Sequence, residues 1–253
     1  MNSKLLKVLA AATVAVLLVA AAGVWWFFRG DPVDEVSLEA ATESVITADA
    51  AADDGTATPS GEVAAVTATD LSGTWTVDTT SGDFDYESAT GSFVGFRIEE
   101  ELSGIGSTTA VGRTGDVEGG IVIDGTTVTD VTFDVDVTTI TTEDSRRDHN
   151  VQDALDTGEY PTASFALTEP IELTDAALAG EPFAATGTGQ LTIHGTTRDV
   201  EIGLDAQLVA DTIVIVGSTD ITFSDYGVDV PDSQIVVSVD DFGVLELQLL
   251  LVR

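Results

Sequence analysis

The chain has 253 residues, with 9 lysines and arginines against 44 aspartates and glutamates, which gives a formal net charge of -35. A charge of this sign repels phosphate backbones and anionic headgroups, which argues against a nucleic-acid partner and against a basic lipid-binding patch. The absence of cysteine excludes disulfides, thiolate nucleophiles and cysteine-ligated metal centres.

Residues 1–30 carry the pattern of a membrane anchor. Lys4 and Lys7 precede an apolar run over residues 8–28. As a helix, about 21 residues at about 1.5 Å each span about 30 Å, the thickness of the hydrocarbon core of a bilayer. The lysines predict a cytoplasmic N-terminus and an extracytoplasmic remainder, held as a single-pass protein of the cell membrane. The alternative is a signal peptide cleaved at the small residues Ala20, Ala21 and Ala22, which would release the remainder as a secreted protein.

Residues 31–70 differ in composition, being rich in Ala, Thr, Asp and Glu and free of aromatic residues. Such a segment cannot bury enough apolar surface to offset the entropy lost on ordering. We therefore predict a disordered acidic linker, which is extended because its charges repel one another. The alternative is a transient helix supported by Val36, Leu38, Val45 and Ile46.

Residues 71–253 show one strand pattern after another, separated by Gly, Asp, Thr and Pro. Apolar and polar residues alternate along 94–98, 131–138 and 245–251, which is the period of a half-buried β-strand. Residues 187–208 contain two such runs joined at a His-Gly pair, which predicts a hairpin. About eight or nine strands with short links favour an antiparallel sandwich or a closed barrel.

Residues 139–160 interrupt the strand pattern. Ser145 is followed by Asp148, a spacing typical of the N-terminal cap of a helix. We therefore predict a short helix from Arg146 to Leu155, which would cover one end of a barrel.

His149 and His194 are the only histidines and the first candidates for catalysis or metal binding. Asp148 or Asp199 would supply a third ligand, but the spacing matches no metal motif. No serine has a Gly-x-Ser-x-Gly setting, and no calcium-binding loop is present. We therefore expect no enzyme, no cofactor and no metal, with a hydrolase as the least favoured alternative. Each histidine would pin a loop or, alternatively, cap the mouth of a cavity.

The inward face of the predicted strands consists of Val, Ile, Leu and Phe, which leaves two interpretations open. An eight-stranded barrel is about wide enough to fill itself with side chains or to hold one small ligand. An apolar ligand of a few isoprene units would gain on the order of 10 kcal/mol, at about 0.8 kcal/mol per buried CH₂. A filled interior would instead indicate a structural or adhesive module displayed on an acidic stalk.

Five segments resemble the YceI-like family of exported lipid-binding proteins. They are Trp-Thr-Val-Asp at 75–78, Thr-x-x-x-Arg-Arg-Asp-His at 142–149, Tyr-Pro-Thr-Ala-Ser-Phe at 160–165, Gly-Gln-Leu-Thr-Ile-His-Gly-Thr-Thr-Arg at 189–198 and Ile-Thr-Phe-Ser-Asp-Tyr-Gly at 221–227. The resemblance covers the chain from Trp75 onward. It implies an extended, lipocalin-like antiparallel barrel whose tunnel takes a polyisoprenoid chain, such as a quinone tail or a polyprenyl phosphate. It also implies export and no catalysis.

The chain departs from the family pattern at two places. Thr-Ser at 80–81 stands where the family usually has His-Ser, and glutamates at 99–101 occupy a region that normally carries another histidine. If those histidines hold a headgroup, the ligand here differs or lacks an anionic head. The excess of acidic residues favours the same conclusion, unless Arg146, Arg147 or Arg198 binds the anion.

The prediction is therefore an all-β, membrane-tethered, extracytoplasmic barrel at 71–253 that sequesters or transports a long apolar isoprenoid lipid of quinone or polyprenyl type. Inward strand residues would supply the affinity, while basic, histidine and tyrosine side chains would orient a headgroup. The residues predicted to bind the ligand are Phe96, Val111, Val117, Ile121, Phe133, Val135, Arg146, His149, Tyr160, Phe165, Leu191, Ile193, His194, Phe223 and Tyr226.

Overall fold

The computed structural model describes residues 33–52, 70–84, 86, 89–102, 106–229 and 236–253. The predicted membrane anchor at 1–30 and residues 53–69 of the predicted linker lie outside the described residues. Within the described residues, no helix combines the length and the apolar character needed to cross a membrane.

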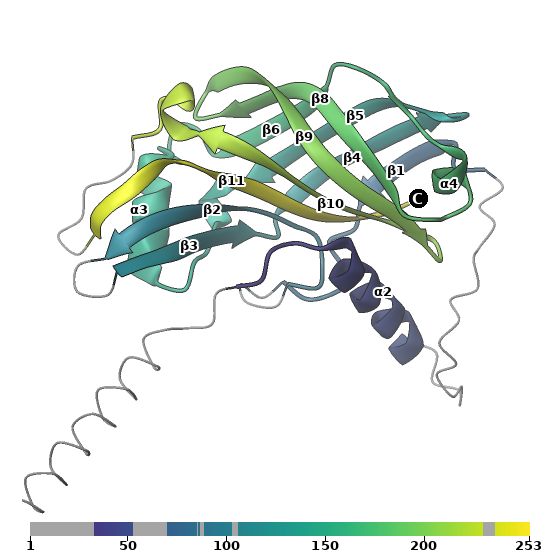
Figure 1. The fold of residues 1–253 in the computed structure, drawn as a ribbon, viewed down its shortest axis with the longest axis horizontal. Helices are drawn as coiled ribbons and strands as arrows, with labels where there is room; N and C mark the ends of the chain where they lie inside the picture. Colours follow the sequence, from purple (N-terminus) through teal and green to yellow (C-terminus); the bar gives the residue numbers. More distant parts are fainter. Residues whose placement is uncertain (1–32, 53–69, 85, 87–88, 103–105, 230–235) are drawn as a thin grey trace, which may run out of the picture. The chain divides into compact units, whose positions relative to one another are not determined.

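Eight antiparallel strands close into a ring (Figure 1). In ring order they are β1 (Gly73–Val77), β4 (Val117–Asp124), β5 (Thr127–Asp136), β6 (Thr162–Leu167), β8 (Phe183–Ile193), β9 (Thr196–Val209), β10 (Thr212–Thr222) and β11 (Val236–Val252). The ring closes at β1, where Trp75 pairs with Ile121 of β4 and Thr76 pairs with Val252 of β11. This closure confirms the predicted all-β barrel and excludes the two-sheet sandwich.

The length of β11 lets it pair with two neighbours besides β10. Its C-terminal residues pair with β1, and the rest pairs with β2 (Phe93–Leu102), which in turn pairs with β3 (Gly106–Thr114). A register shift between Val239 and Gly243 marks a bulge, which bends the strand. The short strand β7 (Ile171–Glu172) pairs with β5. The β2–β3 hairpin therefore continues the wall beside β11.

Alternation along the strands separates the interior from the outer face. Leu245, Leu247 and Leu249 of β11 pack within one apolar cluster together with inward residues of β5, β6 and β10. The residues between them face the other way, because successive side chains of a strand point to opposite sides of the sheet. Glu246 and Gln248 accordingly bond to groups outside the ring.

Short helices cover and connect the strands. They are η1 (Val137–Thr139), α3 (Ser145–Ala154), α4 (Asp175–Leu178) and η2 (Phe223–Tyr226). α3 and α4 lie at opposite ends of the barrel (Figure 1). The predicted short helix is confirmed as α3, and Val151 and Leu155 pack against the inner cluster.

The cap of α3 differs from the prediction. Asp144, not Ser145, accepts a hydrogen bond from the backbone N–H of Arg146. Asp148 instead accepts hydrogen bonds from the backbone N–H and the hydroxyl of Thr142, so it ties the helix to the preceding segment. Asp and Ser are comparable N-cap residues, and the two are adjacent in the sequence, so the sequence alone did not distinguish between them.

α2 (Leu38–Ala52) departs from the predicted disordered linker. Ala41 is 1% exposed, because it packs on Val209, Val214 and Leu250 of the barrel. These three apolar residues lie on the outer face of β9, β10 and β11, where α2 covers them. Residues 35–52 are therefore part of the folded domain.

The reason for this correction is tertiary packing. Val36, Leu38 and Val45 pack against the same cluster, while Ile46 stays exposed. The composition of residues 31–70 indicates how little apolar surface this segment has, but not which surface elsewhere in the chain it packs on. Most helical stability comes from packing of an apolar face, and here the partner surface is supplied by strands far along the chain.

Candidate ligand-binding cavity

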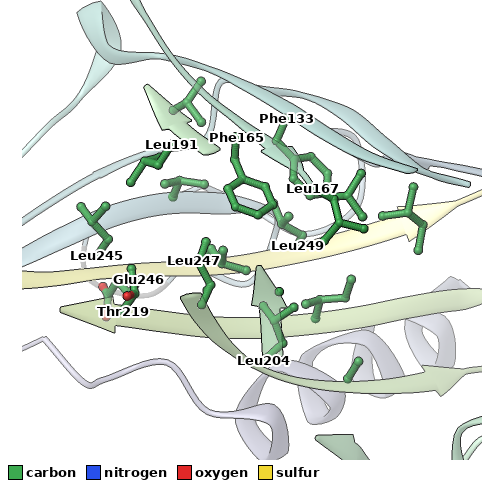
Figure 2. A pocket seen from close by; sticks show the side chains of 18 of the residues that line it. Phe133, Phe165, Leu167, Leu191, Leu204, Thr219, Leu245, Glu246, Leu247 and Leu249 are labelled. Atoms are coloured by element: carbon green, nitrogen blue, oxygen red, sulfur yellow. The ribbon is translucent and has the colours of Figure 1, made fainter. Parts of the chain in front are cut away.

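The interior of the barrel contains a cavity of ≈ 240 Å³. Its wall is built mainly from Leu, Ile, Val and Phe side chains of β5, β6, β8, β9, β10 and β11, with a contribution from β2 (Figure 2). The lining runs along β8 from Phe183 to Ile193, a strand length of about 33 Å at about 3.3 Å per residue. It also includes Leu155 beside α3 and Ala177 of α4, so the cavity is elongated along the barrel.

Several inward side chains are only partly buried although they lie inside a closed ring. Phe133, Phe165, Leu245 and Leu247 are of this kind, and all four line the cavity (Figure 2). Protein interiors are normally packed as densely as organic crystals, which would leave such residues almost no exposure. Their remaining exposure faces the cavity. The interior is therefore hollow, which argues against a structural module with a filled interior.

Two glycines let aromatic rings lie against the wall. A Cβ at Gly189 would stand 2.5 Å from the ring of Phe165, and a Cβ at Gly112 would stand 2.5 Å from the ring of Phe96. Neither glycine has a positive φ, so the requirement is for space rather than for backbone conformation. Any larger residue at these positions would push the rings toward the middle of the cavity.

One end of the cavity is closed by η2 and the residues after it. Phe223, Tyr226 and Val228 are buried, line the cavity and form one cluster with Leu191 and other wall residues. A tyrosine hydroxyl is already neutral at physiological pH, and burial raises the pKa of Tyr226 further. This end is thus apolar apart from an uncharged hydroxyl.

The turn between β8 and β9 contacts η2. His194 and Gly195 have φ values of 49° and 69°, the positive values that two-residue hairpin turns favour. The imidazole of His194 packs edge-on against the ring of Tyr160, with 4.8 Å between centroids, and its Nδ1 lies 3.3 Å from the carbonyl oxygen of Tyr226. The structure therefore brings Tyr160, His194 and Tyr226 together, and of these three Tyr226 lines the cavity.

Arg198 of β9 makes a second link to η2. Its Nε and Nη2 donate hydrogen bonds of 3.0 and 2.8 Å to the carbonyl oxygen of Asp225. The neighbouring carbonyl, that of Tyr226, is the one beside His194. Two side chains of the predicted hairpin thus hold the last turn of η2 over the end of the cavity.

Four other predicted residues lie outside the cavity lining. Arg146 and His149 are exposed on α3, where the imidazole Nε2 of His149 is 3.5 Å from Asp153 Oδ2. Val111 and Val117 are fully buried in packed regions. Contact of these residues with a ligand stays a prediction. Across the described ranges, no three His, Asp or Glu side chains gather closely enough to hold a metal ion.

The remaining predicted residues are in the wall. They are Phe96, Ile121, Phe133, Val135, Phe165, Leu191, Ile193, Phe223 and Tyr226. The wall also contains Leu204, Leu208, Ile215 and Leu247, which the prediction did not single out as ligand-binding. These four residues show the same alternation of apolar and polar positions as the predicted wall residues, because every strand contributes one face to the same cavity.

A buried ion cluster lies on the β2, β3 and β11 part of the sheet. Glu246 is 2% exposed and binds Arg97 and Arg113, with N–O distances of 2.7 Å to each. Glu100 pairs with Arg147. Burial raises the pKa of Glu100, and attraction to the guanidinium of Arg147 offsets only part of that rise. In the region where the family usually has a histidine, this chain therefore has an ion-paired glutamate.

Comparisons with known proteins agree with this architecture. A family model described as the YceI-like domain matches residues 75–250. A polyisoprenoid binding domain from Saccharophagus degradans, implicated in plant cell wall breakdown, is 17% identical with a TM-score of 0.52, over 71% of this chain and 98% of that one. BcnA from Burkholderia cenocepacia is 19% identical with a TM-score of 0.51, over 69% of this chain and 98% of that one. Curated protein sequences gave no match. Because the family model spans most of the chain, the protein belongs to the YceI-like family.

Proposed function

We propose that the protein is a membrane-tethered, extracytoplasmic binding protein that sequesters or transports a long apolar isoprenoid lipid of quinone or polyprenyl type. The observation that carries this proposal is the elongated, apolar cavity inside the barrel, whose leucines and phenylalanines keep exposed surface. The family supports the ligand class, since the similar protein from Saccharophagus degradans is described as a polyisoprenoid binding domain.

The affinity would come from burial of hydrocarbon. An isoprene unit contributes five carbons, which at about 0.8 kcal/mol per buried group gives about 4 kcal/mol per unit before the entropic costs of binding. A few units are enough for tight binding without an ion pair. Binding is also the only chemistry that a wall made almost entirely of aliphatic and aromatic side chains supports, so no catalytic step is part of the proposal.

The membrane tether is supported by the sequence of residues 1–30, with its lysines followed by a long apolar run. A tether would keep the barrel beside the bilayer, which is where isoprenoid lipids reside. This arrangement shortens the path between the source of the ligand and the cavity.

Substitution of Ala185 by tryptophan tests the cavity directly. Ala185 lines the cavity, whereas its neighbour Ala184 is exposed on the other face of β8. An indole at 185 would occupy the space that the lipid needs, whereas the same group at 184 would project outward. For the full chain, we expect A185W to retain at least about tenfold less prenylated quinone after gel filtration than the unmodified chain.

The matched control is A184W, which we expect to retain as much quinone as the unmodified chain. Far-UV circular dichroism of both variants checks that the barrel is intact. Equal retention by A185W and A184W would contradict binding inside the barrel.

A further inference from the structure

The polar residues of the cavity wall include no cation. They are Thr114, Ser164, Glu181, Gln207, Thr219, Tyr226 and Glu246 among the described residues. Figure 2 shows Thr219 and Glu246 at one side of a wall whose other labelled side chains are leucines and phenylalanines. The carboxylate of Glu246 is neutralised by Arg97 and Arg113, so among the residues that the structure describes the lining offers an entering anion no lysine, arginine or histidine of its own.

The arginines near the cavity are already engaged with acids. Arg97 and Arg113 both bind Glu246, which is nearly inaccessible to solvent. Arg147 binds Glu100 and Glu143. Turning Arg147 toward a phosphate would leave the buried Glu100 without its partner, which is strongly unfavourable. Turning Arg97 or Arg113 would remove one of the two guanidinium groups that hold the buried Glu246.

The remaining arginines of the described domain lie elsewhere. Arg198 is held by the carbonyl oxygen of Asp225, and Arg253 donates to the carbonyl oxygen of Asp70. Arg146 is exposed on α3 and is not part of the lining. An anion in the cavity would thus remain uncompensated in surroundings of low polarity, within a chain whose formal net charge is -35.

An uncharged oxygen can be accommodated in the same wall. The hydroxyl of Thr219 donates to the carbonyl oxygen of Glu201 at 2.8 Å, which leaves its lone pairs able to accept from an alcohol. The neutral phenol of Tyr226 can donate to a carbonyl. Both residues line the cavity, so a hydroxyl or a quinone oxygen would find partners there.

We infer that the bound isoprenoid ends in an uncharged group, an alcohol or a quinone, and that the cavity discriminates against phosphate and pyrophosphate. This inference rests on the proposed isoprenoid binding and narrows its ligand class. It depends on the placement of charges around the cavity and not on the length of the hydrocarbon.

A competition between two ligands that differ only in the end group tests the inference. The full chain in detergent is mixed with equal amounts of geranylgeraniol and geranylgeranyl monophosphate, and the two adducts are resolved by native mass spectrometry. We expect the alcohol adduct to exceed the phosphate adduct by at least about tenfold. A phosphate adduct equal to or larger than the alcohol adduct overturns the inference and leaves isoprenoid binding standing. No adduct at all, or equal adducts on A185W and the unmodified chain, overturns both.

A pair of charge variants tests the cause of the discrimination. Thr219 lines the cavity, and its neighbour Ser218 is exposed on the opposite face of β10. We expect T219K to raise the ratio of phosphate to alcohol adduct by about tenfold, since it supplies the missing cation, and S218K to leave the ratio unchanged. A T219K protein that still binds the alcohol without any gain in phosphate contradicts the electrostatic cause. The competition on the unmodified chain decides the inference even if T219K does not fold.

Discussion

Asp78 is the last residue of the Trp-Thr-Val-Asp segment at 75–78, and it stabilises the fold rather than lining the cavity. Its Oδ1 accepts hydrogen bonds from the backbone N–H and the hydroxyl of Thr80 at 2.7 Å each, and from the N–H of Ser81 at 3.2 Å. Burial by itself raises the pKa of this carboxyl, but the hydrogen bonds from Ser81 and Thr80 outweigh burial and lower the pKa. The Thr-Ser pair that replaces the His-Ser of the family therefore caps a carboxylate that is 9% exposed.

Substitution of Asp78 by asparagine should produce a stability loss that depends on pH. Because the pKa of Asp78 is lowered by folding, its carboxylate stabilises the fold above the unfolded pKa of about 3.9, and this contribution is lost as the pH falls through the folded pKa. We expect D78N to reduce the free energy of unfolding by about 1–3 kcal/mol at neutral pH. The difference from the unmodified chain should shrink at about pH 3 in urea denaturation.

Asp130, an exposed residue of β5, gives the control. D130N should change the free energy of unfolding by less than about 0.5 kcal/mol at either pH. A D78N deficit of constant size from neutral to acid pH would show that ionisation of Asp78 plays no part.

At the scale of elements, η2 is the part of the cavity wall that side chains from outside the cavity hold most clearly. Its carbonyl groups are held by Arg198 and lie beside His194, while Phe223 and Tyr226 close the end of the cavity. The link between the hairpin and η2 explains why polar residues of the hairpin lie beside an apolar cavity. Those polar residues position the element that covers the ligand.

Substitution of Arg198 by alanine should speed the release of a ligand. Loss of two hydrogen bonds to the carbonyl oxygen of Asp225, at about 1 kcal/mol each, should raise the release rate of a prenylated quinone by up to about thirtyfold. Gln190 of β8 bonds to Asp199 on the exposed side of the same hairpin and gives the control, since Q190A leaves η2 untouched. Stopped-flow displacement measures both variants, and equal release rates for R198A and Q190A would contradict a holding role for Arg198.

The elements show what sequence patterns can and cannot predict. Strands β5 and β11 and helix α3 follow from alternation and capping signals that lie within each segment. Helix α2 was only the alternative to a disordered linker, because the surface that stabilises it belongs to Val209, Val214 and Leu250, far along the chain. Pairing partners, such as that of Thr76 with Val252, are likewise properties of distant segments and not of either strand alone.

At the scale of the whole molecule, the decisive property is that the barrel is closed and not filled. Alternation identifies an apolar face on each strand, but it does not say whether that face meets other side chains or empty space. The wall positions Phe165 and Leu191 could therefore be predicted as inward, whereas the cavity became evident only when all eight strands were assembled. The family resemblance, and not the periodicity, predicted the tunnel.

The distribution of charge is also a property of the whole molecule. Asp130 and Asp134 of β5 are exposed, while Glu246 and Glu100 are neutralised by arginines where the structure buries them. The cavity is thus left to hydrocarbon, and the few polar atoms in its wall are suited to an uncharged end group.

Extraction of the purified full chain with organic solvent, followed by mass spectrometry of the extract, tests the account most directly. If the barrel holds an isoprenoid lipid, the extract contains a polyprenol or a prenylated quinone that is depleted from the A185W protein prepared in the same way. An extract from the unmodified chain with no isoprenoid beyond the amount found with A185W would contradict it.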